Sequence, residues 1–318
     1  MSSQSGQSGR ADRAHTRRPV VVGVDGSRGS SSAIRYAVQE ARRLGTALRL
    51  VHVVPDYVAM TPMMPMYPSD SLTETGVTVL GRAEREAAVL APDLVITSVL
   101  RHGSRAAELA AGAADAELLV VGRDDRSFLE HLVVGNTACG VAGRASVPVV
   151  VVPPGWDSPV EHGRVLVGVK STEHATELLA DAFETAAERG DGVAVLHAWK
   201  LPGGYDDIIE SRLAAEEWSG RARHQMEELV APLRERFPDV DVELRVVHDH
   251  PAHALVTASD KADQLVLVRR AHGLPMTVHL GGTARAVLRS THCPVRILPP
   301  NHLLQDDEVS ERPVPANA

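Results

Sequence analysis

The sequence is poor in aromatic residues, in cysteine and in long apolar runs. Phe, Trp and Tyr make up only 3% of its 318 residues. This leaves the core to Val, Leu, Ile and Ala and removes the stacking side chains that single-strand nucleic-acid binders need. The two cysteines, Cys139 and Cys293, are too few for a disulfide framework and fit a reducing compartment. We expect both to be inert buried thiols.

A basic surface is also missing. Lys and Arg number 33 against 41 Asp and Glu, a net charge of −8, which disfavours nucleic acid as a partner. No apolar run approaches the roughly 18 residues of a membrane span. The arginines of residues 1–18 are not followed by the apolar stretch of a secretory signal. The sequence therefore predicts a cytoplasmic protein that binds neither nucleic acid nor membranes, with flexible tails at residues 1–18 and 301–318.

The chain repeats itself once, at an offset of 145 to 146 residues. Val22-Gly23-Val24 falls on Val167-Gly168-Val169, and Pro148 falls on Pro294. A duplicated gene with few insertions would leave such a register. The repeat predicts two domains, at residues 19–153 and 164–300, joined by a linker at residues 154–163.

Within each repeat, short apolar runs alternate with segments of helical period, which is the pattern of a parallel sheet covered by helices. In the first repeat we expect a helix that ends at Gly45, and further helices at 77–90, 106–114 and 137–144. The expected strands are 20–24, 48–54, 94–100, 118–121 and 147–152, and in the second repeat 165–169, 193–198, 242–247, 265–268 and 295–298. We therefore predict an α/β fold with two tandem five-stranded doubly wound parallel sheets.

Ligands of such sheets bind beyond the carboxyl ends of the strands, where the strand order reverses. In the first repeat this edge carries Asp25-Gly26-Ser27, His52-Val53-Val54 and Gly122, and Gly135-Asn136-Thr137 opens the last helix. Glycines at a strand end and at a helix N-terminus leave main-chain N–H groups free to approach phosphate. These segments form a candidate nucleotide site. Asp25 has the alternative role of capping the turn into the first helix together with Ser27.

The order, spacing and duplication of these segments resemble the tandem-domain members of the universal stress protein family over about residues 19–300. The resemblance implies an adenine nucleotide alpha hydrolase-like fold, a cytoplasmic role in the stress response, and ATP as ligand. The nucleotide-binding members carry an acidic residue after the first strand, an adenine contact at the second, and the pattern GxxGx9G[ST]. Carried over to this sequence, the binding residues are Asp25, Val53, Gly122, Gly135, Asn136 and Thr137.

Two positions depart from the family pattern. Asp125 stands at the position of the second glycine of the pattern, and Asn136 stands at the position of its Ser or Thr. A carboxylate about 4 Å from a phosphate charge costs ~1 kcal/mol in water and ~4 kcal/mol at an effective dielectric constant near 20. Either a Mg²⁺ ion bridges Asp124 and Asp125 to the phosphates, or these side chains turn outward and Arg123 and Arg126 replace their charge.

Three functions therefore remain open. The first is a stress-response regulator that binds nucleotide, and the second is a scaffold that acts only through unknown protein partners. The third is a weak nucleotide hydrolase. We do not expect a classical enzyme, because the sequence has no GxSxG elbow, Walker lysine motif or paired metal carboxylates.

The second repeat has lost more of the pattern. Lys170 replaces the acidic residue, and Val268 and Ala271 occupy both glycine positions before Gly281-Gly282-Thr283. We expect it to bind nucleotide poorly or not at all. The last strand of each repeat is apolar and needs a partner. The family resemblance implies that the two repeats pair through these strands as a pseudo-dimer, with room for further self-association.

Several other features have a structural and a functional interpretation. His52 and His197 recur at one strand position, and we expect both to be structural groups satisfied by neighbouring backbone. His248, His250 and His253 have a spacing that could hold a metal, but we expect a solvated loop. The Met- and Pro-rich segment 61–68 could cover a ligand or bind a soft metal, and we expect a mobile loop.

Overall fold

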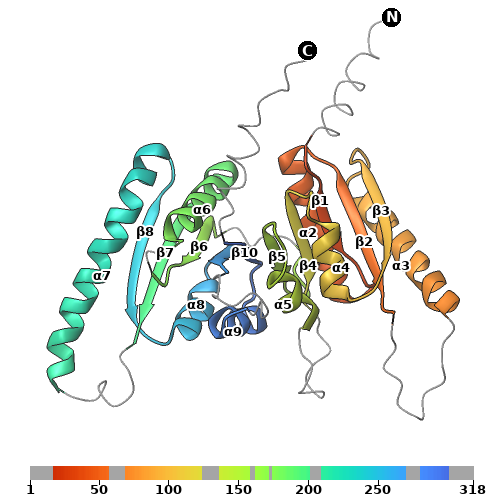
Figure 1. Cartoon of the computed structure of the whole chain (residues 1–318). Helices are drawn as coiled ribbons and strands as arrows, with labels where there is room; N and C mark the ends of the chain where they lie inside the picture. The colour runs from red at the N-terminus through yellow and green to blue at the C-terminus, as the bar shows by residue number, and fades with distance from the viewer. Residues whose placement is uncertain are drawn as a thin grey trace, which may run out of the picture. The chain divides into compact units, whose positions relative to one another are not determined.

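The computed structural model describes residues 17–56, 69–123, 136–157, 162–171, 174–200, 209–269 and 280–300, with only the main chain at 69–70, 136 and 209–215. The chain divides into two compact units, and the main boundary lies between Val160 and Glu161 (Figure 1). Residues 1–16 of the predicted tail 1–18, the predicted tail 301–318 and the segment 61–68 lie outside the described residues. Arg17 and Arg18, predicted as part of the first tail, contact the end of α2 and Thr46.

The first unit has the predicted alternation of strands and helices. Its elements are β1 (Val20–Gly23), α2 (Arg28–Leu44), β2 (Leu48–Val54), α3 (Ser69–Leu90), β3 (Ile96–His102), α4 (Arg105–Gly112), β4 (Leu118–Gly122), α5 (Asn136–Ala142) and β5 (Val149–Val152). The strand order is β3-β2-β1-β4-β5, and every neighbouring pair is parallel. The doubly wound sheet is confirmed.

The second unit repeats this design. Its elements are β6 (Arg164–Gly168), α6 (Ala175–Arg189), β7 (Gly192–Trp199), α7 (Ile209–Arg236), β8 (Val242–His248), α8 (Pro251–Ser259), β9 (Gln264–Val268), α9 (Gly282–Ser290) and β10 (Val295–Leu298). The strand order is β8-β7-β6-β9-β10, which matches the order in the first unit strand for strand. The predicted pairing of the two repeats through their last strands stays a prediction.

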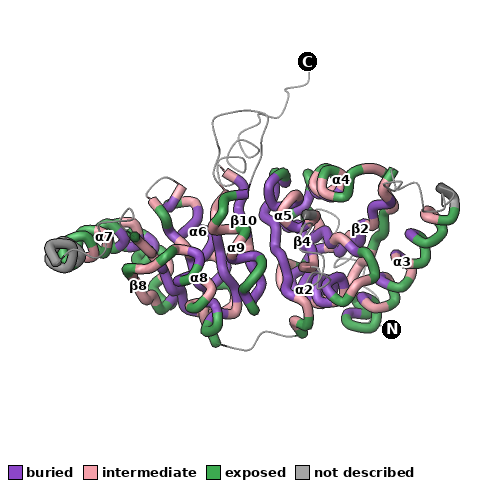
Figure 2. The backbone as a smooth tube through the Cα atoms, turned by 90° about the horizontal axis from the view of Figure 1, so that it is seen from below, coloured by how far each residue is buried: buried purple, intermediate pink, exposed green. Residues whose placement is uncertain are grey.

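The core of the first unit explains why its central strands are continuous apolar runs. All residues of β5 and all but the last of β1 and β4 are buried, because helices cover both faces of a parallel sheet. In Figure 2, α2 and α3 lie on one side of this sheet, and α4 and α5 lie on the other. Alternate residues of β1, such as Val20 and Val22, pack with Ile34 of α2 and Leu80 of α3.

Helix α2 ends as the sequence predicts. Gly45 adopts the left-handed conformation, with φ of 63°, and its N–H caps the last turn. A residue with a Cβ would pay a steric penalty at this φ, so glycine is favoured there. Gly190 closes α6 in the same way, with φ of 74°.

Some predicted boundaries were wrong. Helix α3 begins at Ser69, eight residues before the predicted start, because its first two turns are polar and carry no apolar period. Strand β3 runs from Ile96 to His102 rather than over 94–100. It is the exposed edge strand, so its polar end gave no strand signal. Cys293 is buried as expected, but Cys139 is only half-buried.

The first turn of α2 lies directly against the end of β4, and two glycines make this contact. A Cβ on Gly122 would overlap the carbonyl group of Gly29, and a Cβ on Gly29 would overlap the carbonyl oxygen of Arg123. The missing side chains therefore allow main chain to pack on main chain. The glycine at 122 is required by this packing, whatever it also offers to a ligand.

We expect Gly122→Ala to lower the free energy of unfolding by about 1–3 kcal/mol, since the added methyl group overfills a closed contact. Urea unfolding of the full chain measures this. Gly81→Ala on α3 is the matched control, because its Cβ would approach Arg85 Nη1 no closer than 3.6 Å. Equal stability of Gly122→Ala and the wild type would contradict the packing role.

Candidate functional site

A cavity of about 360 Å³ opens at the carboxyl ends of the first unit's strands. It lies where β1 separates β2 from β4, which is the point at which the strand order reverses. Its described lining residues are Gly23, Val24, Asp25, Ser27, Ser30, Val51, His52, Val53, Arg105, Leu109, Val121, Gly122, Thr137 and Ala138. The volume falls in the range of roughly 300–1,000 Å³ that is usual for small-ligand sites.

Four predicted site residues line this cavity, and they come from four separate segments. They are Asp25 after β1, Val53 in β2, Gly122 at the end of β4 and Thr137 in α5. Asn136 begins α5, and only its main chain is described. Gly135, like Asp124 and Asp125, lies outside the described residues.

A second, larger groove of about 800 Å³ has four lining residues in common with the first cavity. Besides Asp25, His52, Val53 and Arg105, its described lining residues are Val54, Pro55, Asp56, Leu72, Thr75, Val79, Gly103 and Ser104. The groove extends from the end of β2 between α3 and the start of α4. A ligand in the first cavity therefore has room to extend in this direction.

Asp25 shapes the turn that leads into α2. Its Oδ1 accepts a hydrogen bond from the N–H of Ser27 at 2.9 Å. Ser27 Oγ in turn accepts from the N–H of Ser30 at 3.2 Å and caps the helix. The capping role of Asp25 is thus confirmed, and it involves one carboxylate oxygen. Among the described residues, no group engages the second oxygen of this exposed carboxylate.

His52 is a structural group, as expected. Its Nδ1 lies 2.7 Å from the carbonyl oxygen of Val24. Because a carbonyl only accepts, Nδ1 carries the proton in this contact. His197 repeats the arrangement with the carbonyl oxygen of Val169, at 3.0 Å. Each histidine joins two neighbouring strands at the edge where the ligand cavity opens in the first unit.

Arg105 is a charged cavity residue that the sequence did not lead us to expect. It is the first residue of α4, after the N-cap Ser104, and it lines both cavities. A signal was present, because Gly103-Ser104 directly after a strand predicts a helix start at this edge of the sheet. The residue after such a cap lies at the ligand-binding edge.

The comparisons with known proteins agree with the fold of two repeated units. The model of the universal stress protein family matches residues 16–153 and again 161–299. A universal stress protein of Mycobacterium tuberculosis (strain ATCC 25618 / H37Rv) is 30% identical over 289 residues, which cover 87% of this chain and 95% of that protein. One of Mycolicibacterium smegmatis is 28% identical over 288 residues, covering 88% of this chain and 97% of that protein.

The chain belongs to the universal stress protein family. Its fold is also similar to the crystal structure of a universal stress protein from Archaeoglobus fulgidus, with a TM-score of 0.66 and 18% identity over 89% of this chain and 96% of that one. Membership of the family supports a role in the stress response, and proteins of this family are generally not classical enzymes. None of the described helices is long and apolar enough to cross a membrane.

The second universal stress protein unit carries the opposite charge at the matching edge. Lys170 follows β6, where Asp25 follows β1, and Val268 ends β9, where Gly122 ends β4. The next residue, Arg269, is partly buried, and this burial lowers its pKa. Gly281 and Gly282 open α9 with free space around them, whereas Ala271 lies outside the described residues.

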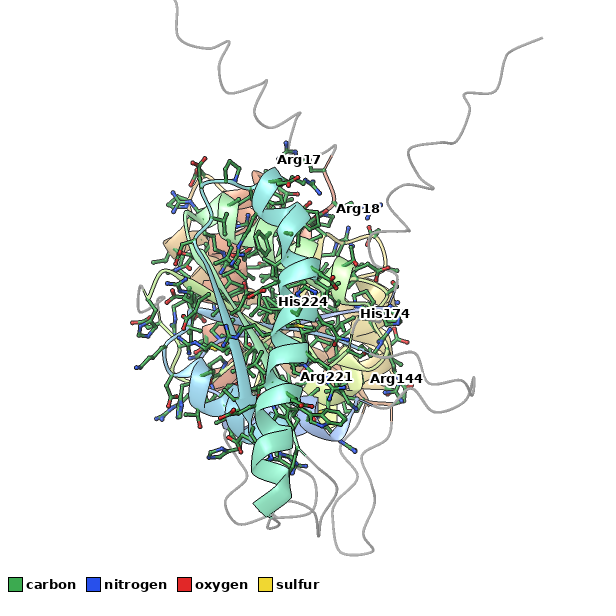
Figure 3. All side chains as sticks on the ribbon, turned by 90° about the vertical axis from the view of Figure 1, so that its left-hand side faces the viewer. Arg17, Arg18, Arg144, His174, Arg221 and His224 are labelled. Carbon is green, nitrogen blue, oxygen red and sulfur yellow. The ribbon has the colours of Figure 1, made fainter. Side chains whose placement is uncertain are left out.

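An aromatic stack lies beside this edge in the second unit. The indole of Trp199 stacks on the imidazole of His248 with ring centroids 4.3 Å apart, and on Trp218 of α7 at 6.5 Å. The guanidinium of Arg221, labelled on α7 in Figure 3, lies 5.3 Å from the centroid of Trp218. Trp199 follows His197 by two residues, as Val54 follows His52. Trp199 of the stack therefore stands at the position that matches Val54, which lines the larger groove in the first unit.

The three clustered histidines of the second unit contact other residues of the chain, and two of them contact Asp249. His248 belongs to the aromatic stack. His253 Nδ1 lies 2.6 Å from Asp249 Oδ2, and the N–H of His250 donates to Asp249 Oδ1. The hydrogen bond with His253 is the main cause of the lowered pKa of Asp249. Among the described residues, no group of three or more His, Cys, Asp and Glu side chains could hold a metal ion.

The two roles of Asp25 can be separated by substitution. Asp25→Ala removes the acceptor of the Ser27 N–H, and we expect it to lower the free energy of unfolding by about 0.5–1.5 kcal/mol. Asp25→Asn keeps an acceptor oxygen and should stay within about 0.5 kcal/mol of the wild type. Urea titrations compare the three proteins. Equal stability of the alanine variant and the wild type would show that the turn does not depend on the carboxylate.

Proposed function

We propose that this universal stress protein binds an adenine nucleotide such as ATP in its first unit and acts as a regulator in the stress response. The supporting observation is that Asp25, Val53, Gly122 and Thr137 line one cavity at the strand-order switch of the first unit. Such crevices are where doubly wound folds take their ligands.

The chemistry of the lining suits a nucleotide. The half-engaged carboxylate of Asp25 can accept hydrogen bonds from ribose hydroxyl groups. Val53 offers an apolar surface and strand-end main chain to the base, and the start of α5 at Thr137 lies where a helix dipole favours an anion. Asp124 and Asp125 follow β4 in the sequence and are the residues through which a Mg²⁺ ion would bridge to phosphate.

Binding is confined to the first unit in this proposal. In the second unit, Lys170 cannot accept a ribose hydrogen bond, and the position that matches Val54 holds Trp199 within an aromatic stack. In the first unit the residue at this position, Val54, lines the larger groove. The second unit thus keeps the fold without the ligand geometry.

The test is isothermal titration of the full chain with ATP, with Mg²⁺ and with EDTA. We expect one ATP per chain, and Asp25→Asn should weaken binding by about tenfold or more, because a charged acceptor is replaced by a neutral one. The matched control is Asp93→Asn, an exposed carboxylate that does not line either cavity; it should bind as the wild type does.

Three results would contradict the proposal. Two ATP molecules per chain would overturn the confinement to the first unit, and equal binding by Asp25→Asn would remove the ribose contact. Absence of binding at millimolar ATP would overturn nucleotide binding altogether. That last result would favour the alternative of a scaffold that acts only through protein contacts.

A further inference from the structure

The charge balance of the first cavity points to one side chain, the guanidinium of Arg105. Among the described residues that line this cavity, Asp25 and Arg105 carry the charges. The larger groove adds a second carboxylate, Asp56. Asp56 lies beside the start of α4, because its Oδ2 is 3.6 Å from where a Cβ on Gly103 would stand. Asp25 and Asp56 therefore repel an anionic ligand group, and Arg105 is the charged side chain among these described lining residues that attracts it.

Arg105 is available for such a ligand. Its side chain is exposed, and among the described residues it makes no ion pair or hydrogen bond. The neighbouring carboxylate, Glu108, is already engaged by Arg101 at 2.8 Å. Arg105 can therefore pair with a ligand in either cavity that it lines without giving up a described hydrogen bond or ion pair. A guanidinium can bind a phosphate with two parallel hydrogen bonds.

The end of β4 gives a second reason to expect a cationic side chain as the partner of a phosphate group. The carbonyl group of Gly29 stands where a Cβ of residue 122 would be. Gly122 therefore has a packing role. In the sequence, Gly122 and Arg123 are followed by two acidic residues, Asp124 and Asp125. Main chain at the end of β4 therefore cannot by itself offset the charge of a phosphate group.

We propose that Arg105 is the residue that makes the first cavity select phosphorylated ligands over the corresponding nucleosides, by pairing with a phosphate group. This inference rests on the proposed nucleotide binding and names its selectivity determinant. Arg105 holds the anionic end of the ligand at the start of α4.

The experiment compares ATP and adenosine as ligands of the full chain, by equilibrium dialysis at two salt concentrations. For Arg105→Ala we expect ATP affinity to fall at least about tenfold, as for loss of a hydrogen bond to a charged group. Adenosine affinity should change less than about twofold. The salt dependence of ATP binding should also become weaker, because a screened ion pair is lost.

Arg28→Ala is the matched control. Arg28 is likewise an exposed arginine at the first position of a helix, α2, but it does not line either cavity. It should bind both ligands as the wild type does. Arg105→Lys keeps the charge without the planar fork and should fall between the wild type and the alanine variant.

The outcomes separate this inference from the proposed function. Undiminished ATP binding by Arg105→Ala, in a protein whose wild type binds ATP, would overturn the role of Arg105 and leave nucleotide binding standing. Equal losses for ATP and adenosine, or an equal loss in Arg28→Ala, would also overturn it. A wild type that binds neither ligand would overturn both proposals together.

Discussion

The packing of α2 on the end of β4 is the contact on which the candidate site at the strand ends of the first unit depends. Gly29 and Gly122 let main chain meet main chain there, and neither tolerates a Cβ without a shift of the helix or the strand. This contact fixes where α2 begins. It thereby fixes the turn that Asp25 and Ser27 form between β1 and the helix, and the depth of the crevice beside it.

The two units show how one fold can keep its core and change its edge. Both have the same strand order and the same histidine contact, from His52 to Val24 and from His197 to Val169. Packing constrains these features, because a partly buried polar ring is stabilised by its hydrogen-bond partner. The strand ends are less constrained by the core. There the second unit has Lys170 in place of Asp25 and an aromatic stack where the first unit has an open groove.

Much of this architecture could be predicted from the sequence, and for a physical reason. Doubly buried strands are continuous runs such as 149–152, and a helix end that requires positive φ favours glycine, as at Gly45. The early start of α3 could not be predicted, because polar turns at 69–76 have no apolar period. The edge strand β3 was misplaced because it is exposed over much of its length.

The candidate site was predictable only in part. Residues next to strand ends, such as Asp25 and Val53, could be located from chain order alone. The start of α4 after Gly103-Ser104 could be located in the same way, but whether the side chain of Arg105 lines the cavity depends on how α4 packs against the sheet. The packing role of Gly122 was also hidden, because the sequence does not show that Gly29 lies against it.

The most direct test of the account is the response of backbone amide NMR signals of the full chain to ATP. The account predicts that signals of Asp25, Val53, Gly122 and Thr137 shift together and saturate with one ATP per chain, while those of Lys170 and Trp199 stay in place. Shifts centred on the second unit, or no saturable shift among the four first-unit residues, would contradict it.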